Sequence, residues 1–270
     1  MGIKNLNRYL LKNCGSNAIH LTHLREFRNR SIVVDTSIYM YKYLEDDKLL
    51  ENFQRLITML KEHHIKPIFI FDGKAPVEKK KLLEQRYEKK RDAEKQYNAI
   101  LKRLSSNDSE IDDGNRCILN QLKKQFIRIS NDDIAKLQNL MKENNVEIVV
   151  AEGEADELCA SYVLSKRCWG VLSDDMDFFV YGCNRILREL SLYDNSVMLY
   201  VLSEILYDLK MPLKSFRDIL VISGTDYNLV SPDENVCLQE TLKWYKWYKV
   251  YCTKHRSEYQ LRSHSASLQV

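Results

Sequence analysis

Five apolar runs in this chain end in acidic residues, and this repeated arrangement constrains the fold more than any other feature. They span residues 32–35, 68–72, 148–156, 171–177 and 220–226. A buried carboxylate without a partner is destabilised by on the order of several kcal/mol, so acids at such positions need a cation. If the runs are neighbouring strands and helix ends, their acids converge on one edge. The pattern therefore predicts an acidic pocket that holds divalent metal.

The apolar runs are too short for helices and alternate with segments of helical spacing, which is typical of an α/β fold. We expect a mostly parallel central sheet flanked by helices, with a helical insertion and a small helical C-terminal region. The expected strands span residues 31–35, 66–71, 146–150 and 169–173, and residues 184–190 and 196–201 are expected to form a hairpin at the sheet edge. Because ligands bind at the carboxyl ends of parallel strands, the acids lie where a site is expected.

A strongly basic segment follows the second acidic run. Residues 74–103 hold eleven Lys and Arg and five Asp and Glu, whereas the formal net charge of the whole chain is +3. The segment 77–104 is predicted to be one long helix without a continuous apolar stripe, and such a helix either bridges solvent or binds a charged partner. A solvated face with internal ion pairs is the common explanation of such a run. Its place directly after Asp72 favours a polyanion held beside metal ions.

The chain divides into four predicted parts. Residues 1–73 and 130–227 form the two parts of one α/β domain, residues 74–129 form a basic helical insertion that stands away from the sheet as a mobile element, and residues 228–270 form a helical C-terminal region. Ser130 is a predicted helix cap, and residues 105–116 are a predicted loop.

The composition narrows the class of protein further. The seven cysteines form no C-x-x-C pair, and no run of 18 apolar residues and no secretory signal is present. We therefore expect an intracellular protein in a reducing compartment, either nucleus or cytoplasm including a viral replication compartment, that is not secreted and does not associate with membranes. None of the six histidines falls within an acidic run, which argues against histidine-based nuclease chemistry, and the cysteines have no partnered histidines, which argues against a zinc site.

Six short motifs in order resemble the flap endonuclease / XPG family of metal-dependent, structure-specific 5′ nucleases, which have a PIN-like fold. The resemblance covers Met1 to about Tyr227. The motifs are M-G-I-K-N-L, V-V-D-T-S, F-I-F-D-G-K-A-P, E-G-E-A-D-E, S-D-D-M-D and I-S-G-T-D-Y. Each is weak alone, but the six in this order form a specific pattern.

The resemblance implies two Mg²⁺ ions, with Mn²⁺ able to substitute, held by seven carboxylates. These are Asp35, Asp72, Glu154, Asp156, Asp175, Asp177 and Asp226. Two further residues are implied to contact the scissile phosphate, Lys79 and Arg86, which are seven residues apart and so share a helix face. The implied substrate-binding residues are Gly2, Tyr41, which would stack on a base, and Lys74, Lys80 and Lys90 of the insertion. The insertion corresponds to the helical arch through which a single-stranded 5′ end passes.

The chain departs from the family after the last motif. Residues 228–236 read N-L-V-S-P-D-E-N-V, without the glycines of the helix-two-turn-helix that grips duplex DNA, and the aromatic and basic segment 244–249 is a candidate replacement. No clamp-binding Q-x-x-L-x-x-F-F motif is seen. We expect a short member of the family, viral or organellar in origin.

The expected function is a Mg²⁺-dependent flap endonuclease or 5′–3′ exonuclease that cleaves DNA with a 5′ flap, a nick or a free 5′ end in replication, repair or recombination. Two alternatives stay open. One is a 5′ exonuclease that prefers RNA, because the fold and metal chemistry are shared. The other is a catalytically silent scaffold that binds nucleic acid, although seven mutually repelling acids are hard to retain without metal. Oligomeric state and preferred substrate structure are not specified by the sequence.

Overall fold

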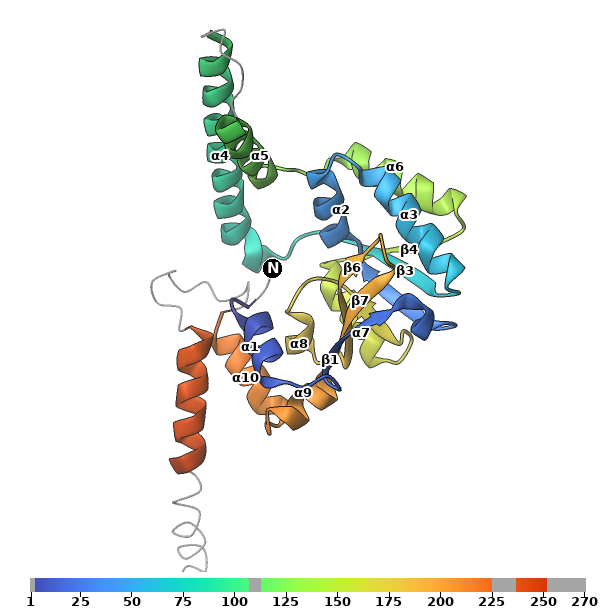
Figure 1. Ribbon diagram of the computed structural model, residues 1–270, viewed down its shortest axis with the longest axis vertical. Coiled ribbons are helices and arrows are strands. Elements are labelled where there is room, and N and C mark those ends of the chain that lie inside the picture. The colour runs from blue at the N-terminus through green and yellow to red at the C-terminus, as the bar shows by residue number, and fades with distance from the viewer. Residues whose placement is uncertain (1–2, 107–112, 225–236, 252–270) are drawn as a thin grey trace, which may run out of the picture.

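One seven-stranded sheet organises the chain (Figure 1). The computed structural model describes residues 3–106, 113–224 and 237–251. The strands are β1 (Ile19–His23), β2 (Ser31–Asp35), β3 (Lys66–Phe71), β4 (Glu147–Val150), β5 (Gly170–Leu172), β6 (Arg185–Ser191) and β7 (Ser196–Val201). Their order is β1-β7-β6-β5-β2-β3-β4. The pairs among β4, β3, β2, β5 and β6 are parallel, and the two pairs that involve β7 are antiparallel.

Helices cover both faces of the sheet, which confirms the predicted fold class. The helices are α1 (Leu6–Asn13), α2 (Thr36–Glu45), α3 (Leu49–Glu62), α4 (Lys80–Ser106), α5 (Asp113–Gln125), α6 (Asn131–Glu143), α7 (Ala155–Leu164), α8 (Phe178–Tyr181), α9 (Leu202–Asp208) and α10 (Leu213–Ile222), with 3₁₀ turns η1 (Leu24–Phe27) and η2 (Val77–Lys79) and a further helix over 238–251. None of the described helices is both long and apolar enough to cross a lipid bilayer.

Two apolar cores lie on opposite faces of the sheet, because successive side chains of a strand point to opposite sides. In β2, Ile32 and Val34 join the core beneath α2, α3 and α6, whereas Val33 joins the core beneath α1, α7, α8 and α10. Central strands buried on both faces explain why their sequences are continuous apolar runs rather than alternating ones. That property is what made them detectable in the sequence.

The predicted edge hairpin of β6 and β7 is not at the edge. Strand β1 pairs with β7 from Ile19 to His23 and covers its outer side, which would otherwise present unpaired backbone groups. The segment I-H-L-T-H has an alternating pattern that fits an outer strand, with Ile19 buried and Leu21 exposed. It was missed because it has no acid at its end and no β-branched run.

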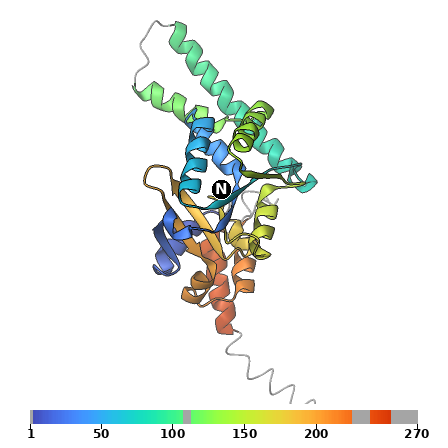
Figure 2. The same ribbon diagram turned by 90° about the vertical axis from the view of Figure 1, so that its right-hand side faces the viewer.

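The basic insertion forms a helical hairpin of α4 and α5 that stands off the sheet (Figures 1 and 2). Tyr97 of α4 packs edge-on against Phe126. Lys123 and Lys124 form ion pairs with acids at the end of α2, so the hairpin is also tied to the body of the protein. Ser130 caps α6 with a full capping box, as predicted, but α5 already begins at Asp113, inside the predicted loop. The four predicted domain boundaries, and the mobility of the insertion, stay predictions.

Candidate active site

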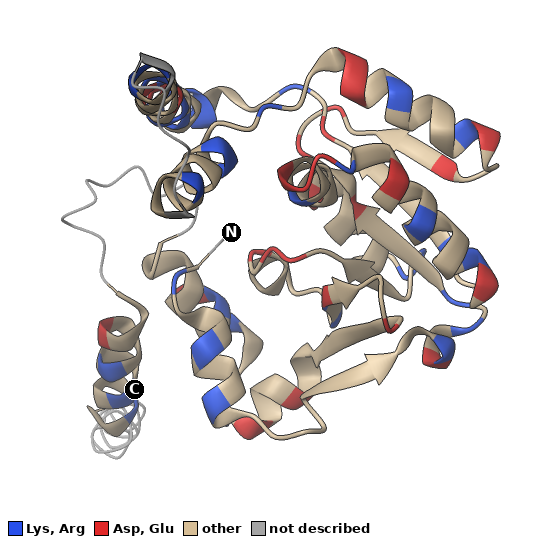
Figure 3. Ribbon diagram, turned by 45° about the horizontal axis from the view of Figure 1, so that its top comes forward, with Lys and Arg blue, Asp and Glu red and all other residues tan. Residues whose placement is uncertain are grey.

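The acidic motif residues lie at one edge of the sheet, where the parallel strands end. Strand pairing is level at that edge: Asp35 is opposite Ile70, and Phe71 is opposite Val150. Asp35 ends β2, Asp72 follows β3, Glu154 and Asp156 begin α7 after β4, and Asp175 and Asp177 follow β5. Figure 3 shows acidic stretches on loops of this edge, on the side toward α4 and α5. We call this group the acidic edge.

Asp35 is the most buried member of the acidic edge, with 6% of its surface exposed. The Ser173 hydroxyl donates a hydrogen bond of 3.0 Å to Asp35 Oδ2, and the same hydroxyl accepts one of 3.1 Å from the Asp175 backbone N–H. Burial and the nearby charges of Asp72, Asp175 and Asp156 raise the pKa of Asp35 to about 8. The carboxylates therefore lie close enough to repel one another, and a bound cation would relieve that repulsion.

Asp72 links the second motif to the third. Its Oδ1 accepts a 2.8 Å hydrogen bond from the Ala155 backbone N–H in the first turn of α7, where an anion is favoured. Its Oδ2 accepts from the Ser37 hydroxyl at the start of α2. Next along the chain, the Gly73 N–H donates to the Gly153 carbonyl at 2.7 Å. The loops that follow β3 and β4 are thus joined by backbone as well as side-chain hydrogen bonds.

Glu154 forms an ion pair with Lys79, a buried residue of the basic insertion. Lys79, 7% exposed, lies 2.6 Å from Glu154 Oε2 and 2.8 Å from Oε1. Asp156 accepts a 3.2 Å hydrogen bond from the Tyr181 hydroxyl. Burial and the charge of Glu154 raise the pKa of Asp156 to about 6, although Lys79 opposes the shift. A predicted phosphate contact and a predicted metal ligand therefore form an ion pair with each other.

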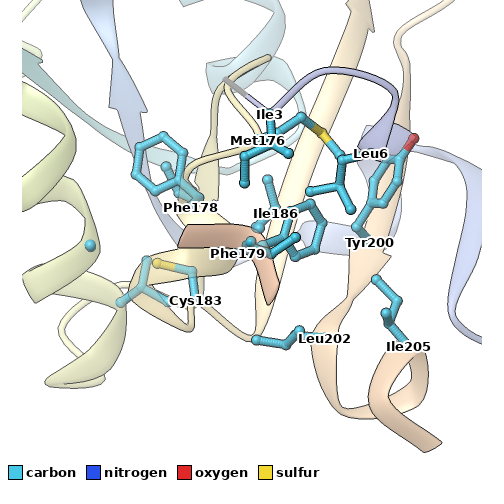
Figure 4. Packing of buried hydrophobic residues seen from close by; sticks show 14 of the residues in the cluster. Ile3, Leu6, Met176, Phe178, Phe179, Cys183, Ile186, Tyr200, Leu202 and Ile205 are labelled. Atoms are coloured by element: carbon cyan, nitrogen blue, oxygen red, sulfur yellow. The ribbon is translucent and has the colours of Figure 1, made fainter. Parts of the chain in front are cut away.

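The S-D-D-M-D motif separates its acids by hydrogen bonding. Asp175 Oδ1 accepts from the Asp177 N–H at 3.0 Å, so these two stay at the acidic edge. Asp174 turns the other way: its Oδ1 accepts from the Glu189 N–H of β6 at 2.6 Å, and its Oδ2 lies 3.5 Å from Lys42 Nζ. Met176 is 3% exposed and packs with Ile3 and Leu6 (Figure 4), which fixes the loop in the core.

The α4/α5 hairpin contacts α2 close to the acidic edge. Lys90 Nζ lies 4.8 Å above the Tyr41 ring and also donates to the Ile127 carbonyl at 2.9 Å. Tyr41 is half-buried, and its pKa is raised by burial and by the charge of Asp72, while Arg86 lowers it. Tyr41, Arg86 and Lys90 are thus gathered near Asp72. The side chains of Lys74 and Lys80 are exposed, and Lys80 lines a groove of about 640 Å³ along α4.

The donor set fits a hard divalent cation, because it consists of carboxylate oxygens and includes a buried Asp35 that forms no ion pair with any described residue. The side chains are not arranged as a finished coordination shell: within residues 3–106, 113–224 and 237–251, no three His, Cys, Asp or Glu side chains are placed to hold one ion. Gly2 and Asp226 lie outside the described residues. The seven-carboxylate metal site therefore stays a prediction.

Replacing Asp35 by Asn is expected to stabilise the metal-free protein. The folded-state pKa of Asp35 is raised to about 8, so the folded state binds an extra proton between about pH 4 and pH 8 and is destabilised as the pH rises through that window. Asn keeps the acceptor for Ser173 and removes the charge. In EDTA, thermal unfolding of Asp35→Asn should show a Tm gain of about 3 °C or more at pH 8.5 that shrinks toward pH 5.

The matched control is Asp218→Asn, which removes one exposed carboxylate on α10. An equal gain in the control, or a gain for Asp35→Asn that does not depend on pH, would mean that charge repulsion at the acidic edge is not its cause.

Three supporting residues were missed by the sequence reasoning: Ser37, Ser173 and Tyr181. The two serines orient Asp72, Asp35 and the Asp175 backbone. Both stand within motifs, two residues after Asp35 and two before Asp175, so position was an available signal. Tyr181 had no such signal, because the short helix α8 that carries it was not predicted.

Two comparisons with known families match the two ends of this site. Residues 1–93 match the XPG N-terminal domain, and residues 145–226 match the XPG I-region. Together they contain every predicted metal ligand, in the expected order. The chain belongs to the flap endonuclease / XPG family. The segment between the matches is most of the α4/α5 hairpin and α6.

Individual relatives agree with membership of the XPG family. Flap endonuclease 1 of Glycine max is 30% identical over 250 residues, which covers 84% of this chain and 62% of the relative. The chain thus spans about three fifths of the length of its curated relatives. Among solved structures, the catalytic core of Rad2 in complex with DNA substrate has a TM-score of 0.62 at 20% identity, covering 100% of this chain and 81% of that one. Flap endonuclease-1 from Methanococcus jannaschii has a TM-score of 0.61 at 17% identity, covering 94% and 80%.

Proposed function

We propose that this XPG-family chain is a Mg²⁺-dependent, structure-specific 5′ nuclease that hydrolyses phosphodiester bonds of DNA with a 5′ flap, a nick or a free 5′ end. The observation that supports this most is the contact between the basic insertion and the acidic edge, which Lys79 of η2 makes with Glu154. One part attracts a polyanion and the other suits metal ions, and metal-dependent phosphodiester hydrolysis uses both.

The proposed ligands are the six described carboxylates of the acidic edge together with Asp226. When bound there, two divalent ions would supply an activated water and stabilise the leaving oxygen of an in-line displacement. The protein contributes the placement of the ligands: Ser173 orients Asp35, and Ser37 and the Ala155 N–H orient Asp72. Such supporting hydrogen bonds fix the direction of each carboxylate.

The proposed role of Lys79 and Arg86 is to contact the scissile phosphate. Glu154 holds Lys79 beside the proposed metal ligands, and Lys79 is nearly buried. Lys79 would therefore contact a DNA strand only where that DNA reaches the acidic edge. Arg86 is an exposed residue of α4, as is Lys81. Tyr41, beneath Lys90, offers an aromatic face for an unpaired base near the cut.

The experiment that tests this proposal is a Mg²⁺ titration of cleavage on labelled 5′-flap, nicked, blunt-duplex and single-stranded DNA, with matched RNA strands as a further arm. Metal-dependent cleavage near a branch or from a 5′ end is the expected result. Cleavage of RNA alone would move the assignment to an RNA 5′ exonuclease. Binding of nucleic acid without cleavage at any metal concentration would favour the alternative of a catalytically silent scaffold.

Substitution of the two phosphate-contacting residues should affect chemistry more than binding. Lys79→Ala and Arg86→Ala are each expected to lower the single-turnover rate on bound flap DNA by about 10²-fold, because each removes a cation from the reacting phosphate. Equilibrium binding should change only a few-fold. Lys81→Ala, an exposed lysine of the same helix, is the control. Weakened binding with an unchanged rate on bound substrate would leave only an electrostatic role for the pair.

A further inference from the structure

A second charged pocket lies at the opposite end of the sheet. It has a volume of about 560 Å³ and opens between the amino ends of β2, β5 and β6. Its lining includes Arg30, Lys166, Arg167, Trp169 and Arg185, and no Asp or Glu is among the described residues that line it. We call it the basic pocket. The five-residue strand β2 separates it from Asp35 by about 13 Å at roughly 3.3 Å per residue, so the two sites are distinct.

Most of the cationic side chains that line the basic pocket form no ion pair with a described residue. Arg167 is paired with Glu147 at 2.8 Å and lies 4.1 Å over the Tyr162 ring. Arg30, Lys166 and Arg185 form no ion pair with any residue that the structure describes. Three like charges in one concave surface repel one another, and an anion bound among them relieves that repulsion.

Trp169 holds two of these cations in place. The guanidinium of Arg185 lies 4.8 Å and that of Arg30 5.9 Å from the Trp169 ring centre, and Phe27 packs 5.1 Å from the same ring. Gly170 lets β6 lie close to β5 beside this ring, because a Cβ there would lie 3.1 Å from the Arg185 carbonyl oxygen and 3.2 Å from Arg185 Cβ. A guanidinium stacked by its face keeps its N–H edge for a ligand, and that edge matches two oxygens of a phosphate.

We propose that the basic pocket binds a phosphate-bearing ligand of nucleotide size. Its volume is within the range of pockets that hold small ligands, and fixed arginine edges beside an aromatic ring suit a nucleotide phosphate. The source is either one unit of a DNA strand or a free nucleotide. The proposal concerns binding and stands apart from the nuclease activity proposed above, although a DNA strand in this pocket would extend the substrate contacts of that activity to the far end of the sheet.

The test is a direct binding measurement in EDTA, where the acidic edge carries no metal and repels phosphate. The probes are deoxyadenosine 5′-monophosphate, followed by calorimetry, and a labelled short oligothymidylate without terminal phosphate, followed by fluorescence anisotropy. The variant is Lys166→Asn with Arg185→Gln. Asn suits position 166, where φ is 62° and the backbone is left-handed. Because the Lys166 side chain forms no hydrogen bond, ion pair or ring contact with any described residue, Lys166→Asn alone is a second variant that keeps the fold.

The matched control is Lys12→Gln with Lys142→Gln, which removes the same charge from two exposed lysines of α1 and α6. We expect the double pocket variant to weaken binding by about tenfold or more, the single variant by a few-fold, and the control by less than twofold. Loss of mononucleotide binding identifies a free nucleotide as sufficient. Loss of oligonucleotide binding alone, with no mononucleotide bound by the native chain, identifies a strand.

Equal binding of both probes by the pocket variant and the control overturns the proposal, as does an equal loss in both. Neither result bears on whether the chain cleaves DNA, because no divalent metal is present in these measurements. If the chain cleaves flaps with Mg²⁺ but its nucleotide binding does not depend on Lys166 and Arg185, the proposed nuclease function stands and the proposal for the basic pocket fails.

Discussion

Asp175→Asn is expected to lower the rate of cleavage by about 10³-fold or more at saturating Mg²⁺, with little loss of fold stability. Asn keeps the side-chain oxygen that accepts from the Asp177 N–H at 3.0 Å, and the Asp175 backbone N–H still donates to Ser173. Only the negative charge is lost, and charge is what a divalent cation needs from this ligand. Single-turnover cleavage of a 5′-flap DNA, measured beside thermal unfolding, checks both halves of the prediction.

The neighbouring acid offers an unusually close control. Asp174 precedes Asp175 in the chain, but its carboxylate is turned toward the Glu189 N–H and Lys42 rather than the acidic edge. Asp174→Asn should lower the rate less than about tenfold. If Asp174→Asn were as damaging as Asp175→Asn, the division of this motif into metal-holding and structural acids would be wrong.

Gly73→Ala is expected to impair both stability and activity. A Cβ on Gly73 would lie 2.0 Å from the Ala151 carbonyl oxygen and 2.7 Å from that of Glu152, and both are backbone atoms that cannot rotate away. The loops after β3 and β4 must separate, which breaks the Gly73 to Gly153 hydrogen bond of 2.7 Å. We expect a loss of about 3 kcal/mol in the free energy of unfolding, and a cleavage rate lower by about 10²-fold because Asp72 and Glu154 move apart.

Gly153→Ala is the control for Gly73→Ala. It adds the same methyl group to the partner loop, where a Cβ meets no atom within 4 Å. Urea unfolding and flap cleavage of this variant should be close to those of the native protein. Similar losses in both variants would show that chain flexibility, rather than the close approach at Gly73, is what the two loops require.

The sequence predicted the parts of the fold in which one run of residues contains the whole signal. The central strands are continuous apolar runs because both of their faces are buried, and the acids that follow β2, β3 and β5 meet because the carboxyl ends of parallel strands share one edge. Strand β1 has one exposed face and no acid at its end, so it was not predicted. The motif acids could be placed on an edge, but not oriented, from the sequence.

Contacts between distant segments were not predictable from the sequence. Lys79 and Glu154 are 75 positions apart and meet only because the sheet brings the two loops together. The basic pocket was missed for the same reason: Arg30 and Lys166 belong to two separate loops, Arg185 begins β6, and the three form no local charge run. The basic insertion could be detected from local composition, because its charged residues are adjacent in the sequence. Charge density along a chain is a poor guide to charge density on a surface.

The central position of β2 in the sheet has a consequence for when the activity can arise. Strand β2 lies between β3 and β5, and Asp35 and Ser173 are 138 positions apart. At translation speeds of about 5–20 residues per second, the partner of Asp35 leaves the ribosome roughly 7 to 28 seconds later. During that interval β2 and β3 can pair, but the acidic edge is incomplete. A growing chain therefore lacks the complete acidic edge until the segment that carries Ser173, Asp175 and Asp177 has left the ribosome.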